Sequence, residues 1–157
     1  MSRRVVVTGV GIVTPFGIEP DGFWEALASG RSAVRALDIE GLNGRVVIGA
    51  PVSDFSARAH VDPKSLRLMS PAVAFGVAAA QRAASDSGWD FGTMDPARLG
   101  AFVGSRGDSS DRQDLVAAVQ LAAETGTFRL DTFGARGLPL VHPMWLLKGL
   151  ANNVLYF

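Results

Sequence analysis

Residues 4–17 read RVVVTGVGIVTPFG, a short, nearly continuous apolar run that ends in a turn. The run Val5–Val13 is rich in β-branched residues, which favour strands. Continuous apolar runs of this length are typical of strands that are buried on both faces, and such strands occur mainly in layered α/β proteins. Pro15 and Gly17 then supply the turn. The segment therefore predicts an opening core strand.

The clearest helix signal lies at residues 71–87. Ser70-Pro71 provides a start, because proline suits the first helical position, and Gly88 provides a stop. Apolar residues recur at spacings of three and four and form two adjacent stripes, which predicts a helix that packs against more than one neighbour. The first stripe is Val73, Val77, Ala80 and Ala84, and the second is Ala72, Phe75, Ala79 and Ala83.

The rest of the chain alternates between short apolar runs and amphipathic segments, which indicates α/β layering. We expect residues 5–13 and 99–103 to be neighbouring strands of one sheet, with helix 71–87 on a face of it. The other expected elements are a helix capped by Asp21 and stopped by Gly30, a strand at 46–48, a helical turn after Asp62-Pro63, a helix from about Ser110 to Gly126 carrying Leu115, Val119 and Ala122, a loop at 127–140 and a last helix from His142-Pro143 through Phe157.

Composition excludes several partners. The chain has 157 residues, about one domain, and its 15 basic and 15 acidic residues cancel, which argues against nucleic acid and anionic membranes. No apolar stretch reaches the roughly 20 residues of a membrane-spanning helix. Arg3 and Arg4 precede an apolar run as in a signal peptide, but glycines interrupt the run and no cleavage site follows. We expect a cytoplasmic protein.

The chain has no cysteine, so it contains no disulfide, thiolate metal site or cysteine nucleophile. His60 and His142 lie far apart and neither sits in a metal-spaced motif, so we expect no metal and no other cofactor. His60 is expected in an exposed loop, and His142 at the start of the last helix or beside a pocket. Neither has a catalytic partner nearby in the sequence.

Two glycine-containing segments follow predicted strands. Gly9-Val10-Gly11 resembles part of a dinucleotide fingerprint, but Thr14 stands where that motif needs glycine or alanine, and Asp38 does not follow a strand. The favoured interpretation is that these glycines let the strand cross close to other backbone. The polar segment 104–111 could bind an anion through free amides, although an ordinary solvated loop is the simpler interpretation.

The same stretch, residues 4–17, closely resembles the opening strand and turn of β-ketoacyl-acyl-carrier-protein synthases. The resemblance continues in order along almost the whole chain. The further matching segments are Phe23–Leu27, Gly30–Val34, Ala83–Gly88, Leu99–Ser105 and Pro143–Asn153.

The resemblance implies an α/β, thiolase-like fold of two similar halves stacked in α-β-α-β-α layers. It implies that residues 1–157 are the N-terminal β-ketoacyl synthase domain, cut before the nucleophile. The family are acyltransferases of fatty acid and polyketide synthesis, in which a cysteine and two histidines join an acyl group to malonyl carried on acyl carrier protein. The implied partners are acyl carrier protein and a ketoacyl synthase subunit, in a homodimer or heterodimer.

None of those three catalytic residues exists in this chain, so no catalytic role is carried over. The resemblance does imply substrate-binding positions. Gly107 matches a position that lines the acyl pocket, with Ser105 and Arg106 beside it, and the loop here is less glycine-rich than in active enzymes. Met144, Trp145 and Asn153 match a helix that contributes to the pocket and to the dimer contact.

Three functions remain open. The first is part of a condensing enzyme, and the second is half of a non-catalytic partner subunit of the chain-length-factor type. The third is an unrelated nucleotide-binding α/β domain. For the first two we expect the isolated chain to lack condensing activity and to be unstable as a monomer, because its apolar helices lack a cover.

Overall fold

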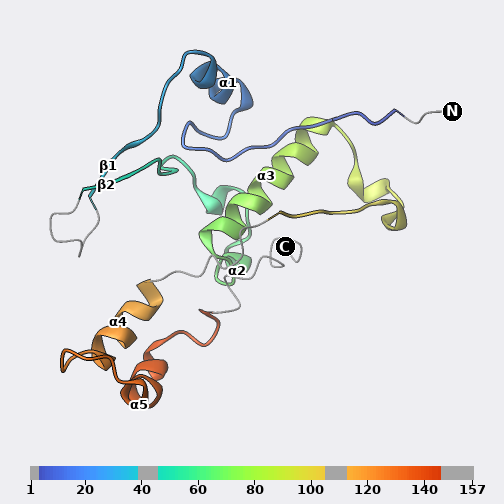
Figure 1. The fold of residues 1–157 in the computed structure, drawn as a ribbon. Coiled ribbons are helices and arrows are strands. Elements are labelled where there is room, and N and C mark those ends of the chain that lie inside the picture. Colours follow the sequence, from blue (N-terminus) through green and yellow to red (C-terminus); the bar gives the residue numbers. More distant parts are fainter. Residues whose placement is uncertain (1–3, 39–45, 105–112, 146–157) are drawn as a thin grey trace. The chain divides into compact units, whose positions relative to one another are not determined.

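The computed structural model describes residues 4–38, 46–104 and 113–145 (Figure 1). The chain divides into two compact units. Unit 1 comprises residues 1–61 and 75–99, and unit 2 comprises residues 62–74 and 100–157. The main elements in chain order are α1 (Pro20–Ala28), β1 (Arg35–Leu37), β2 (Val47–Gly49), α2 (Pro63–Leu66), α3 (Pro71–Ser87), α4 (Gln113–Ala122) and α5 (Leu130–Thr132).

Helix α3 has the predicted bounds. Pro71 opens it, and the hydroxyl of Ser70 accepts a hydrogen bond from the Val73 amide at 3.3 Å. Gly88 follows the last turn with a φ of +67°, a conformation that glycine adopts without steric cost. The local signals that start and stop a helix therefore suffice to place this one.

The buried face of α3 is narrower than the two predicted stripes. Its buried residues are Val73, Ala74, Val77 and Ala78. Ala72 and Ala80 are exposed. The prediction was therefore right for Val73 and Val77 and wrong for Ala72 and Ala80, because periodicity marks every apolar position while burial depends on what packs there.

Other local predictions hold with small shifts. Asp62 caps α2 by accepting hydrogen bonds from the amides of Lys64 and Ser65. Helix α1 begins at Pro20, so Asp21 lies in its first turn and is not the cap. A carboxylate there still stabilises the helix, because it faces the positive end of the helix dipole. Gly30 follows this helix with a φ of +67°.

The sheet described in unit 1 differs from the predicted one. It has two antiparallel strands, β1 and β2, in which Ala36 faces Ile48. β2 confirms the strand predicted at 46–48 within one residue, whereas β1 had no predicted counterpart. Residues 5–13 and 99–104 form no strand, so the prediction that they pair in one sheet is wrong for this structure.

The physical reason for the first of these differences is visible along the N-terminal segment. A strand exists only where a neighbouring strand accepts its backbone hydrogen bonds. Here the Val10 amide donates instead to the carboxylate of Asp86 on α3, at 2.8 Å. The chain then closes a turn by mutual backbone hydrogen bonds of 3.0 Å between Thr14 and Gly17.

Unit 2 contains helical turns where a loop was predicted. Residues 130–140 form α5, the π-helical turn η4 (Phe133–Gly137) and the 3-10 turn η5 (Leu138–Leu140). Ala118 and Ala122 of α4 are buried, whereas Val119 is exposed, which corrects part of the predicted apolar face. Gly137 is buried against Ala118, so packing on α4 stabilises these turns. Their own sequence gives little indication of a helix, because glycine and proline are poor helix formers.

Candidate functional site

Gly9 and Gly11 place the N-terminal segment directly on the backbone of α3. A Cβ at Gly9 would overlap the carbonyl oxygen of Ala83, and a Cβ at Gly11 would overlap that of Ala79. Only glycine allows an approach this close. The glycines therefore serve backbone packing, which agrees with the favoured interpretation of this motif over a nucleotide-binding one.

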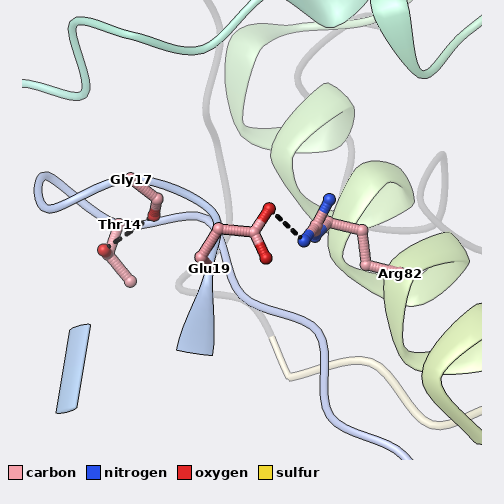
Figure 2. Close-up of polar contacts among 4 residues, drawn as sticks. All are labelled: Thr14, Gly17, Glu19 and Arg82. Atoms are coloured by element: carbon pink, nitrogen blue, oxygen red, sulfur yellow. Dashed lines mark hydrogen bonds and ion pairs between the residues drawn. The ribbon is translucent and has the colours of Figure 1, made fainter. Parts of the chain in front are cut away.

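Two polar contacts hold the same segment to α3. The Val10 amide donates to Oδ2 of Asp86 at 2.8 Å. Further along, Nη2 of Arg82 donates to Oε1 of Glu19, just before α1, at 2.6 Å (Figure 2). Asp86 lies near the C-terminus of α3, where a negative charge opposes the helix dipole. Its position is therefore explained by the amide that it binds and not by the helix itself.

The turn at residues 14–17 is also locked by side-chain contacts. The hydroxyl of Thr14 donates to the Gly17 carbonyl oxygen at 2.9 Å (Figure 2). The same hydroxyl accepts from the Phe16 amide at 3.1 Å. Gly17 has a φ of +107°, which a residue with a side chain rarely adopts. Arg31 lies over the Phe16 ring at 5.5 Å from its centroid. Residues 14–17 therefore form a turn that is stabilised by its own side-chain contacts and by Arg31.

An open cleft of about 580 Å³ lies in unit 1 between Thr8 and the segment that follows α3. Aromatic, apolar and charged side chains line it. They come from Thr8, Trp89, Phe91, Thr93, Met94, Asp95, Arg98 and Leu99. Most of these residues are exposed, so the cleft is more open than a typical small-molecule site.

The predicted substrate-binding residues are only partly described. Ser105, Arg106, Gly107 and Asn153 lie outside the described residues. Met144 and Trp145 are half-buried in unit 2. The Met144 amide donates to Nδ1 of His142 at 3.1 Å, and the Trp145 amide donates to the His142 carbonyl oxygen at 2.8 Å.

Both histidines have structural contacts. His142 accepts the Met144 amide and so caps the turn that leads into the predicted last helix, most of which lies outside the described residues. His60 is half-buried and stacks on Phe55 with ring centroids 5.6 Å apart, and Phe55 meets Phe75 edge to face at 5.0 Å. The expectation of an exposed His60 was wrong, because a local turn brings its ring onto a neighbouring aromatic side chain.

A charged pair in unit 2 carries the one large electrostatic effect found in the described residues. Arg129 donates from Nη2 to Oδ2 of Asp131 at 2.7 Å, and from Nε to Oδ1 at 3.2 Å. This hydrogen bonding, helped by the Thr132 amide, lowers the pKa of Asp131 to about 2. The same partner raises the pKa of Arg129. Both side chains are exposed, so the pair acts locally at the start of α5.

The described residues hold no group of three or more histidine, aspartate or glutamate side chains placed to bind a metal ion. Within them, no helix combines the length and the apolar character needed to cross a bilayer. Sequence reasoning missed two contacts that shape the N-terminal segment, Val10 with Asp86 and Glu19 with Arg82. Asp86 stood within a recognised motif, but its partner is 76 residues away and nothing local identifies it.

Residues 2–136 match the model of the β-ketoacyl synthase N-terminal domain, which is most of the chain. The chain belongs to the β-ketoacyl synthase family. This ketoacyl synthase chain is 37% identical over 158 aligned positions to a protein of Streptomyces halstedii assigned as polyketide β-ketoacyl synthase 1, and the alignment covers 98% of the chain and 36% of that relative. It is 32% identical to a 3-oxoacyl-acyl-carrier-protein synthase 2 of Vibrio cholerae, with 97% and 35% covered.

Solved structures give the fold. One is a ketosynthase bound to a hexaketide, in complex with its type II polyketide synthase acyl-carrier protein. It matches with a TM-score of 0.68 at 21% identity over 98% of this chain and 38% of that one. The ishigamide ketosynthase/chain length factor matches with a TM-score of 0.61 at 23% identity, covering 98% and 36%. The ketoacyl synthase chain therefore has the α/β, thiolase-like fold, as predicted.

The chain covers from 23% of a Streptomyces coelicolor relative to 38% of the ketosynthase solved with its acyl-carrier protein, so it spans well under half the length of these proteins. The alignments to a Streptomyces cyaneus protein assigned as polyketide β-ketoacyl synthase 1 cover 67% of the chain at 43% identity. The family match and the solved structures together establish the family and the fold class of this chain.

Proposed function

We propose that this chain is part of an acyltransferase that extends an acyl chain by decarboxylative Claisen condensation with malonyl-acyl-carrier protein. The observation that carries the proposal is the match of residues 2–136 to the ketoacyl synthase N-terminal domain. Polyketide relatives are 37–43% identical, and the 3-oxoacyl-acyl-carrier-protein synthases are 32–35% identical. These identities favour polyketide synthesis over fatty acid synthesis. We further propose that the protein acts in the cytoplasm.

The condensation requires a cysteine and hydrogen-bond donors. The acyl group is held as a thioester on a cysteine, and malonyl loses carbon dioxide to leave an enolate carbon. That carbon attacks the thioester carbonyl, and a carbon–carbon bond forms as the carbon–sulfur bond breaks and the thiolate leaves with the electron pair. Donors must stabilise the enolate oxygen as its charge develops. These 157 residues contain no cysteine, and His60 and His142 have structural contacts.

In this proposal the residues of the chain shape the site and do not perform the chemistry. Residues 105–107 and Asn153 contribute to the acyl pocket, together with Met144 and Trp145. In the described part, the Met144 and Trp145 amides donate to Nδ1 and to the carbonyl oxygen of His142, so a local turn carries both side chains. The cysteine and the two catalytic histidines come from polypeptide outside these 157 residues.

Acyl carrier protein and a second ketosynthase-type subunit are the proposed partners. The support comes from the solved neighbours, of which one is a ketosynthase in complex with an acyl-carrier protein and another is a ketosynthase/chain length factor. The second neighbour also favours one alternative function, in which the chain belongs to a non-catalytic partner subunit that shapes the product cavity. A nucleotide-binding role has no such support, since Gly9 and Gly11 pack on α3.

The nucleotide sequence downstream of codon 157 separates the first two functions. A continuing frame with a Thr/Ser-x-Cys segment supports the condensing enzyme, and the same frame with another residue in place of that cysteine supports the partner subunit. A downstream sequence with no ketosynthase-like continuation would count against both.

An activity assay tests the chain itself. The purified chain is incubated with acyl- and malonyl-acyl-carrier protein, and mass spectrometry follows the 3-oxoacyl product. We expect no product above the background without enzyme, because no residue here can hold the acyl thioester. Product formed by this chain without another subunit would overturn the assignment of the chemistry to residues outside it.

A further inference from the structure

We draw no further inference here: the strongest candidate, the open cleft of about 580 Å³ between Thr8 and the segment from Trp89 to Leu99, is walled mostly by exposed side chains, and nothing in the described part of the structure shows which ligand or partner covers it.

Discussion

Gly11 lies against the carbonyl oxygen of Ala79 on α3, with no room between them for a side chain. The contact joins segments 68 positions apart in the sequence, and Gly9 repeats it one helical turn further along, at Ala83. The two glycines therefore set the distance between the N-terminal segment and the helix. The stretch at residues 4–17, which resembles the β-ketoacyl synthases, therefore determines how closely this segment packs on α3 in unit 1.

Replacing Gly11 with alanine should destabilise unit 1. The new Cβ would meet main-chain atoms, which cannot rotate away, so the segment itself must shift. We expect a loss of about 1–3 kcal/mol in the free energy of unfolding, measured by urea denaturation.

Gly22→Ala is the matched control, because Gly22 lies within α1 and a Cβ there meets no atom within 4 Å. That variant should be neutral or more stable by up to about 1 kcal/mol, since alanine is the better helix former. Equal stability of the Gly11→Ala and Gly22→Ala variants would show that the segment does not pack on α3 as described.

Removal of the Asp86 carboxylate should release the Val10 amide. Asp86→Ala loses the acceptor at 2.8 Å, and we expect a cost of about 1 kcal/mol together with faster hydrogen exchange of the Val10 amide. Asp86→Asn is the control, because it keeps a side-chain oxygen acceptor and removes a negative charge from the C-terminal end of α3. Val10 exchange that is unchanged in the alanine variant would contradict this contact.

The Asp131 carboxyl should titrate at about pH 2, because hydrogen bonds from Arg129 stabilise its ionised form and lower its pKa from 3.8. A carboxyl whose pKa is lower in the folded state stabilises the fold fully only above its unfolded pKa of about 3.9. That contribution is lost as the pH falls towards 2. Both partners are exposed, so the effect on stability is small.

Carbon-13 NMR of the side-chain carboxyl checks this titration directly. Arg129→Gln should move the Asp131 pKa back towards 3.8, while Arg136→Gln, a change at a nearby exposed arginine, should leave it in place. An Asp131 midpoint that does not respond to Arg129→Gln would rule out the pair as the cause of the low pKa.

The isolated chain should self-associate at low micromolar concentration. Val5 and Val7 of the N-terminal segment are 93% and 84% exposed, and Phe102 is 98% exposed. Exposed apolar side chains favour association, because burying one valine contributes roughly 1.5–3 kcal/mol. Sedimentation velocity should show oligomers, and the double variant Val5→Thr with Val7→Thr should shift the distribution towards monomer.

Val73→Thr provides the contrasting variant, because Val73 is 1% exposed. That change should lower the melting temperature without reducing association. A monodisperse wild-type monomer with a cooperative melt would show that the chain covers its own apolar surface, and the expectation of instability would then be wrong.

Much of the helical structure could be predicted from the sequence because its signals are local. Pro71 and Gly88 bound α3, and Asp62 caps α2. The stretch at residues 4–17 was sufficient to indicate the family and its fold class, since its order of valines, glycines and turn residues is specific. For the candidate site, the sequence provided positions by resemblance, and of these only Met144 and Trp145 fall within the described residues.

The tertiary structure decided what the apolar segments contact. Residues 5–13 carry the composition of a core strand, yet Val10 hydrogen-bonds Asp86 and no strand pairs there, because a strand depends on a neighbour that its own residues do not specify. The turns at 130–140 likewise depend on a partner, because they pack on α4. Helix signals act within a few residues, whereas the contacts of Gly11 and Asp86 join positions about 70 residues apart, and only the folded chain brings them together.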